Sequence, residues 1–184
     1  MGPVAELKEE HKAINLMLLI LVEIARKLEG GIAVRTEHLD QILEFIGVFV
    51  NKCHNGKEET LLFYAMEESG ISREEMSMNL LLKEHQKGRQ YFQKLTQAVT
   101  QYKTGSREVS SVIIDNIRNY VALLTKHIET EESVLYPSAE KRIPEKRQEV
   151  LLKEFEVLER EKIGPEQHEK FHKLLHHLEN IYLE

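Results

Sequence analysis

The sequence has few of the residues that make turns, disulfides or large aromatic cores. Its 184 residues include no tryptophan, one cysteine, four prolines and nine glycines. The single cysteine, Cys53, excludes an internal disulfide and is typical of a protein from a reducing compartment. Because proline and glycine are scarce while leucine, glutamate and lysine dominate, the composition favours long helices over a turn-rich β fold.

Long hydrophobic runs and excess positive charge are also missing. The longest apolar run, Leu16–Val22, is far shorter than the ~20 residues that a membrane span needs. The N-terminal segment, Met1–Glu10, is acidic and lacks the positively charged stretch of a secretory signal. The 25 basic and 31 acidic side chains give a net charge of −6, which argues against a nucleic-acid partner. We therefore expect a cytoplasmic protein with no membrane and no nucleic-acid partner.

The few breaks in the chain divide it into helices. Ser72 and Glu75 have the spacing of a capping box and predict the start of the third helix. Pro137 predicts a kink or an end in the fourth. We predict a single all-α domain over residues 1–184, with an up-down-up-down four-helix bundle over about 4–140 and two additional helices over about 144–184. The breaks are Gly30-Gly31, residues 69–72, residues 103–106, Pro144 and Gly164-Pro165.

Each of the four long segments carries an apolar stripe at steps of three and four residues, and polar side chains interrupt every stripe in phase. Such steps keep side chains on one helix face, so the interrupting groups are predicted to point into the core. The stripes are Leu7, Ile14, Leu18, Leu21, Ala25 and Leu28; Leu43, Val50, Leu61 and Ala65; Met78, Leu81, Gly88, Phe92, Leu95 and Val99; and Ile113, Ile117, Tyr120, Leu124 and Val134. The polar groups are His11, His54, Glu58, His85, His127 and Glu131.

Two inward carboxylates among four imidazoles indicate a metal centre. An unpartnered carboxylate in a core costs several kcal/mol, and two divalent cations would neutralise the pair. His54/Glu58 and His127/Glu131 are both spaced i, i+4, which stacks each pair on one helix face. Imidazole and carboxylate without thiolate select iron, manganese or zinc, and open positions at the metals would bind a small ligand such as O₂.

The order of these residues resembles the hemerythrin-like, or HHE cation-binding, family: a lone histidine, His-x-x-x-Glu, a second lone histidine and a second His-x-x-x-Glu. The resemblance covers about residues 4–140 and includes the apolar Leu61-Leu62-Phe63 and Val134-Leu135-Tyr136-Pro137 after the two motifs. It implies two iron ions with an oxo or hydroxo bridge in a helical bundle, with manganese or zinc as substitutes. The implied ligands are His11 and His54 for one iron, His85 and His127 for the other, and Glu58 and Glu131 as bridges.

One departure from the oxygen-carrying hemerythrins affects the implied function. Those proteins place two histidines four residues apart on the third helix, whereas the positions at that spacing around His85 are Leu81 and Arg89. Six protein ligands leave one iron more open, which argues against plain reversible oxygen storage. We expect a monomer or homodimer that binds or senses O₂, nitric oxide or peroxide, or handles iron, with ligand binding favoured over catalytic turnover.

Residues beside the expected ligands are assigned ordinary structural roles. Solvated surface charge is expected for four neighbouring glutamates, with hydrogen bonding to the histidines as the alternative. Tyr120 is expected to be plain core, with donation to a bound oxygen species as the alternative. Cys53 is expected to be a buried and inert thiol. The four glutamates are Glu10, Glu59, Glu84 and Glu132.

Two other functions remain open. His168-Glu169-x-x-His172 matches His-Glu-x-x-His, the zinc protease signature, although its metzincin continuation is absent because residues 175 and 178 are leucines. Either histidine would alternatively supply a missing iron ligand. The other function is a metal-free helical interaction module. Leu16–Val22 is apolar all round its helix, so the C-terminal segments or a second copy of the chain must cover its outer face.

Overall fold

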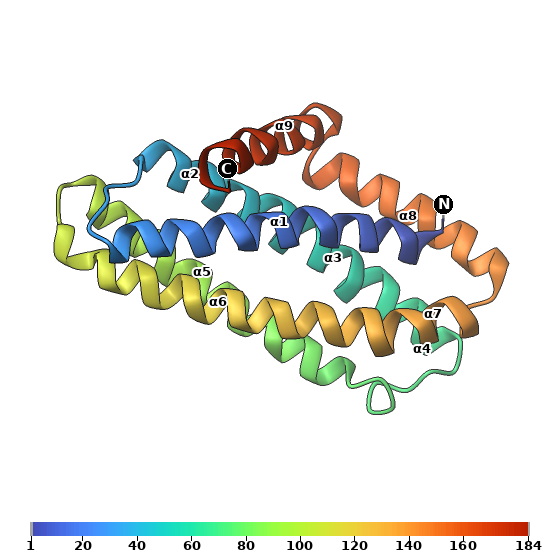
Figure 1. The fold of residues 1–184 in the computed structure, drawn as a ribbon. Coiled ribbons are helices and arrows are strands. Elements are labelled where there is room, and N and C mark those ends of the chain that lie inside the picture. The colour runs from blue at the N-terminus through green and yellow to red at the C-terminus, as the bar shows by residue number, and fades with distance from the viewer. Residues whose placement is uncertain (1, 184) are drawn as a thin grey trace.

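A computed structural model describes residues 2–183, apart from the side chains of residues 107 and 165, and within this range the chain is helical with no strand (Figure 1). Three segments, labelled η1, η2 and η4, are π-helical and η3 is a short 3₁₀ turn. The elements are α1 (Pro3–Glu29), α2 (Thr36–Phe45), η1 (Ile46–His54), α3 (Asn55–Lys57), η2 (Glu58–Leu62), α4 (Phe63–Glu68), α5 (Met78–Lys103), η3 (Arg107–Val109), α6 (Ser110–Thr130), η4 (Glu131–Leu135), α7 (Tyr136–Arg142), α8 (Glu145–Lys162) and α9 (Pro165–Tyr182).

Most helix ends fall where glycine and proline predict them. α1 ends before Gly30, α5 ends at Lys103, and α9 begins directly after Gly164, whose φ of 79° suits glycine alone. The predicted start of the third helix is wrong. The backbone N–H of Glu75 does bond Ser72 Oγ at 3.1 Å, but residues 73–77 form turns and α5 begins only at Met78.

The fourth long segment continues past its proline. Pro137 lies in the first turn of α7, where a missing N–H is tolerated, and the helix runs on to Arg142. The π-helical segment η4 directly precedes α7, so the chain changes its helical hydrogen-bonding pattern before Pro137 without leaving the helix.

The π-helical segments shift the buried face by one residue. A π turn holds more residues than an α turn. After such a turn, steps of three and four residues counted from the preceding apolar stripe therefore no longer lead to the buried face. Leu62 and Leu135 are fully buried, whereas Leu61 is half-buried and Val134 is 47% exposed. The predicted core positions Leu61 and Val134 are therefore wrong by one residue each.

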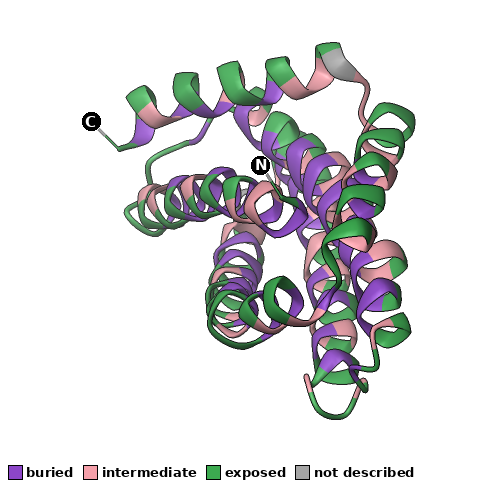
Figure 2. Ribbon diagram, turned by 90° about the vertical axis from the view of Figure 1, so that its right-hand side faces the viewer, coloured by how far each residue is buried: buried purple, intermediate pink, exposed green. Residues whose placement is uncertain are grey.

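The long helices pack along one another, and the C-terminal pair covers part of this core. α1 contacts α6, α6 contacts α5, and α5 contacts α2. α8 and α9 lie against α1, as Figure 1 shows in orange and red, and the buried positions in Figure 2 face inward between the helices. This confirms in part the expectation that the C-terminal segments cover the outer face of Leu16–Val22. Leu19 and Val22 nevertheless stay 56% and 42% exposed.

The apolar core consists of two clusters rather than one. The larger cluster fills the space between α1, α2, α5, α6 and α9, and the smaller one joins the beginning of α1 to α4, α7 and α8. On α1, Leu7 belongs to the smaller cluster and Ile14 to the larger, with His11 between them. A layer of buried polar side chains therefore separates the two clusters.

Candidate metal centre

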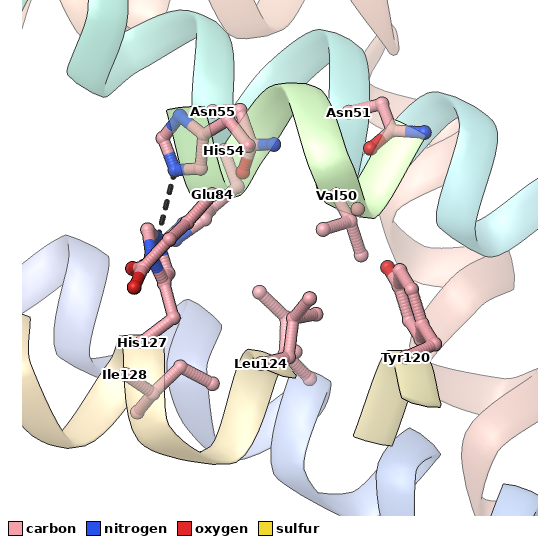
Figure 3. Close-up of a pocket in the computed structure, with 12 residues that line it drawn as sticks. Val50, Asn51, His54, Asn55, Glu84, Tyr120, Leu124, His127 and Ile128 are labelled. Carbon is pink, nitrogen blue, oxygen red and sulfur yellow. Dashed lines mark hydrogen bonds and ion pairs between the residues drawn. The ribbon is translucent and has the colours of Figure 1, made fainter. Parts of the chain in front are cut away.

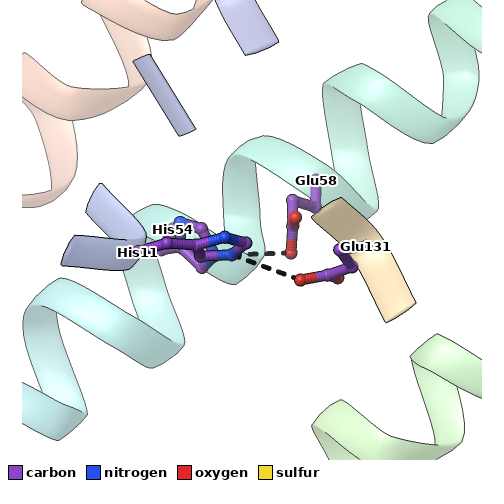
Figure 4. A group of neighbouring side chains, drawn as sticks. All are labelled: His11, His54, Glu58 and Glu131. Atoms are coloured by element: carbon purple, nitrogen blue, oxygen red, sulfur yellow. Dashed lines mark ion pairs between the residues drawn. The ribbon is translucent and has the colours of Figure 1, made fainter. Parts of the chain in front are cut away.

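The six polar side chains predicted to point inward converge in this layer. All six are buried, with at most 5% of their surface exposed. The rings of His11 and His54 lie with centroids 4.8 Å apart, and those of His85 and His127 lie 4.6 Å apart. Each histidine pair forms a compact group of potential ligand atoms with the same two carboxylates, Glu58 and Glu131. Figure 4 shows one of these two groups.

The two carboxylates lie between the histidine pairs. Oε2 of Glu58 is 3.7 Å from His54 Nε2 and 3.3 Å from His85 Nε2. Glu131 reaches both sides as well, because its Oε2 is 3.3 Å from His11 Nε2 and its Oε1 is 2.9 Å from His127 Nε2. Each carboxylate therefore faces both histidine pairs.

Four further glutamates form hydrogen bonds to the four histidines. Every Nδ1 atom bonds a carboxylate from a neighbouring segment, which leaves every Nε2 directed inward. The alternative named for these glutamates, hydrogen bonding to the histidines, is therefore confirmed, although the side chain of Glu132 also remains 44% exposed. The pairs are Glu10 with His54 at 2.7 Å, Glu59 with His85 at 2.8 Å, Glu84 with His127 at 2.8 Å and Glu132 with His11 at 2.9 Å.

Lys57 is a functional neighbour that the sequence reasoning missed. Its side chain is fully buried, and its Nζ lies 2.5 Å from a carboxylate oxygen of Glu10, 2.6 Å from Glu6 and 2.9 Å from Glu159. These carboxylates keep the pKa of Lys57 raised, although its burial alone would lower it. A lysine between the His and Glu of a helical motif looks solvated in the sequence, so no signal indicated this role.

Tyr136 was also missed, because it belongs to an apolar tail. Its hydroxyl donates to Glu58 Oε1 at 2.6 Å and lies 3.2 Å from His11 Nε2. Burial and the neighbouring Glu58 carboxylate raise the pKa of Tyr136 well above its ordinary value. The phenol therefore stays protonated and fixes one oxygen of Glu58.

The remaining donor atoms fit cations. Glu58 Oε2 and both oxygens of Glu131 are buried and accept no hydrogen bond, and the Nε2 atoms of His85 and His127 face each other at 2.9 Å. Burial disfavours the protonated form of His127, yet the neighbouring Glu131 carboxylate raises the pKa of His127 to about 10. In turn, His127 and His11 hold the pKa of the Glu131 carboxyl well below its usual range despite its burial. Buried carboxylate oxygens without hydrogen-bond partners, set among imidazole Nε2 atoms, form a donor set that suits divalent cations.

A small cavity opens beside the histidines (Figure 3). Its volume is about 20 Å³, little more than a water molecule needs, and its lining is mostly apolar. Tyr120 rises from α6 beside Leu124, with its hydroxyl toward Val50. Tyr120 is a core residue, as expected, but its buried hydroxyl has no hydrogen-bond partner.

The other chemically active residues lie outside the centre. Cys53 is buried, as expected, and burial raises the pKa of its thiol to about 12, which keeps it unreactive. The structure places neither His168 nor His172 among the converging ligands. Glu169, the base of a zinc protease motif, pairs with Lys173 at 2.6 Å on the surface.

Comparison with known proteins identifies the pattern. The protein-family model of the hemerythrin HHE cation-binding domain matches residues 2–139 of the sequence and, in a second match, residues 76–183. Three mycobacterial proteins are 23% identical over 133 residues: the uncharacterized protein Mb2018 of Mycobacterium bovis, and the uncharacterized proteins MT2051 and Rv1995 of Mycobacterium tuberculosis. The match covers 72% of this chain and 51% of each relative, so the chain spans about half their length.

No solved structure matches the chain significantly. No helix among residues 2–183 is long and apolar enough to cross a membrane.

Proposed function

This chain belongs to the hemerythrin HHE cation-binding family, and from that premise we propose that it holds two iron ions and binds or senses a small oxidant. The observation that carries the proposal is the layer of inward Nε2 atoms around three carboxylate oxygens without hydrogen bonds. Buried groups of this kind are rare in proteins unless a ligand satisfies them.

We assign the ligands in two groups that share their carboxylates. His11 and His54 would hold one iron, His85 and His127 would hold the other, and Glu58 and Glu131, which belong to both groups, would be shared between them. Iron, when bound, supplies redox chemistry and open coordination positions for a small molecule. Manganese or zinc are substitutes with similar ligand preferences.

The chain's own residues orient and shield this centre. The four outer glutamates fix each imidazole with Nε2 inward, and such partners strengthen metal binding. The cavity beside His54, His85 and His127 has little more room than a water molecule needs, which favours a ligand as small as O₂, nitric oxide or peroxide over a larger substrate. Tyr120 is placed to donate its hydroxyl hydrogen to that molecule. Binding or sensing therefore suits the site better than turnover of an organic substrate.

The remaining parts of the proposal follow from the family and the sequence. The four long helical segments form an up-down-up-down bundle, and α8 and α9 complete a single domain. The protein works in the cytoplasm as a monomer or homodimer, without a membrane or nucleic-acid partner. Iron handling is an alternative role for the same centre.

Metal counting tests the proposal. Metal-free protein loaded with Fe(II) without oxygen is expected to bind two irons per chain, and admitting air is expected to produce a new charge-transfer absorption band. Glu58→Ala and His54→Ala are expected to lose the full two-iron load while the helices persist by circular dichroism. Glu129→Ala, an exposed glutamate on α6, is the matched control and keeps both irons. Two irons retained in both centre variants would reject the assignment.

The two rival functions have less support. A zinc peptidase requires Glu169 as its base, but this carboxylate is paired with Lys173. A metal-free module would bury three oxygens of Glu58 and Glu131 without hydrogen bonds and without a cation. Such burial would lower the free energy of unfolding by several kcal/mol. Loss of zinc from purified protein on His172→Ala, with no iron bound, would favour the peptidase.

A further inference from the structure

A second group of metal-ligating side chains lies in a surface groove of about 330 Å³ between α1, η1, α8 and α9. Carboxylates from α1 and Glu159 of α8 line the groove, together with His168 and His172 of α9. These are the two histidines of the His-Glu-x-x-His sequence, which the proposed function leaves unused. The groove therefore gives this sequence a structural context different from a protease site.

His168 lies near each of the other two donors, and the groove is within reach of solvent. His168 and His172 follow one another by one helical turn, and their ring centroids are 4.7 Å apart. Across the groove, Glu159 Oε1 lies 3.9 Å from His168 Nε2. The side chains of His168 and Glu159 are 34% and 27% exposed, so a hydrated ion can approach them. Two imidazoles and a carboxylate are the donors that first-row divalent cations prefer.

The charge under the groove is not balanced. Lys57 provides one ammonium for the three carboxylates of Glu6, Glu10 and Glu159, which leaves a deficit equal to the charge of one divalent cation. Burial raises the pKa of Glu6, as expected for a carboxylate that shares its only counter-ion. Lys57 Nζ already lies among these carboxylates, and the groove that they line extends to the two histidines.

We infer that the groove is a third metal site, which holds one hydrated divalent cation between His168, His172 and Glu159. It is separate from the paired centre but close to it, since Glu10 lines the groove and also bonds His54 at 2.7 Å. Water completes the coordination of the cation, because the site is partly exposed. A cation bound here would lie directly outside the layer of buried polar side chains.

Titration of the metal-free full-length chain with Mn(II) alone tests this site. Bound Mn(II) is counted from the loss of the free-ion electron paramagnetic resonance signal. Wild type is expected to bind one equivalent more than the paired centre takes, and His168→Ala and His172→Ala are each expected to lose that equivalent. His176→Ala is the matched control, because His176 lies one turn further along α9 with its side chain 80% exposed. If the two groove variants bind as much Mn(II) as His176→Ala, the inference is wrong.

A second variant separates this inference from the proposed function. Glu58→Ala disrupts the paired centre and is expected to keep the groove equivalent, which disappears when His172→Ala is added. Circular dichroism checks that each variant stays helical. A wild type that binds only the equivalent removed by His172→Ala would support the groove and reject the paired centre. Unchanged binding on adding His172→Ala to Glu58→Ala would overturn the groove alone.

Discussion

At the scale of single residues, the most informative side chains are buried polar groups without partners. Native proteins leave few such groups, and each requires a reason. The unpartnered oxygens of Glu58 and Glu131 lie among the histidines, whereas the unpartnered hydroxyl of Tyr120 belongs to a residue that lines the small cavity. The first group supports the proposed metals, and the second supports the proposed small ligand.

Replacing Tyr120 by phenylalanine is expected to separate stability from ligand retention. An unsatisfied buried hydroxyl costs about 1–3 kcal/mol, so Tyr120→Phe is expected to stabilise the metal-free protein by about 1 kcal/mol in urea unfolding. In the iron-loaded protein the lost hydrogen bond is expected to speed dissociation of the small ligand by up to about tenfold. Stopped-flow absorbance measures that rate.

Tyr102→Phe is the control for this prediction. The Tyr102 hydroxyl accepts a hydrogen bond from the Val34 backbone N–H at 3.4 Å, so its removal is expected to destabilise the protein and to leave ligand dissociation unchanged. A Tyr120→Phe variant that is less stable than wild type, and releases ligand at the wild-type rate, would contradict the role assigned to Tyr120.

The histidines and their supporting glutamates differ in how far the sequence predicts them. The inward direction of His11 and its counterparts was predictable, because each lies in phase with an apolar stripe of its own helix. The role of Glu132 was not, because it lies at the edge of its helix and meets His11 only through packing of η4 against α1. A single helix cannot reveal a partner that another helix brings.

At the scale of elements, the π-helical segments limit what periodicity can predict. Both His-x-x-x-Glu motifs adjoin such a segment, since η1 ends at His54, η2 begins at Glu58 and η4 begins at Glu131. Single π turns inside helices occur frequently at functional sites. The α-helical period therefore predicts correctly that the six polar side chains are buried, but then misses the buried Leu62 and Leu135 by one residue.

The docking of α9 on α2 is expected to weaken in mild acid. His38 of α2 is buried, its Nδ1 lies 2.8 Å from the Tyr182 hydroxyl, and burial together with the nearby Arg35 lowers its pKa below 6.5. Because the folded state binds this proton less readily than the unfolded state, the contribution of His38 to the free energy of unfolding is fully present above about pH 6.5 and declines as the pH falls below that value.

Urea unfolding of the metal-free protein at pH 7 and pH 5 checks this prediction. His38→Gln lacks the titrating group and is expected to lose less stability between the two pH values than wild type does. His176→Gln, on the exposed side of α9, is expected to follow wild type. An equal loss in all three proteins would show that His38 does not cause the decline.

At the scale of the whole molecule, the polar layer costs stability that the surrounding structure has to offset. It divides the apolar core into two clusters, and Lys57 lies at its edge, where α1, α3 and α8 meet. The sequence predicted the helices and their order because glycines and prolines mark most of their ends. It could not predict the Lys57 contacts, because Glu6 and Glu159 are far from it in the chain and no periodic pattern links them.

Lys57→Met is expected to destabilise the whole protein. Methionine removes the one ammonium shared by three carboxylates, and loss of one partner from a buried ion pair typically costs about 3–5 kcal/mol. Lys52→Met, an exposed lysine of η1, is the control and is expected to change the free energy of unfolding by less than about 0.5 kcal/mol. Urea unfolding of the metal-free proteins measures both. Because Glu10 also bonds His54, Lys57→Met is further expected to weaken iron retention, whereas equal stability of the two variants would mean that Lys57 does not hold the C-terminal helices to the core.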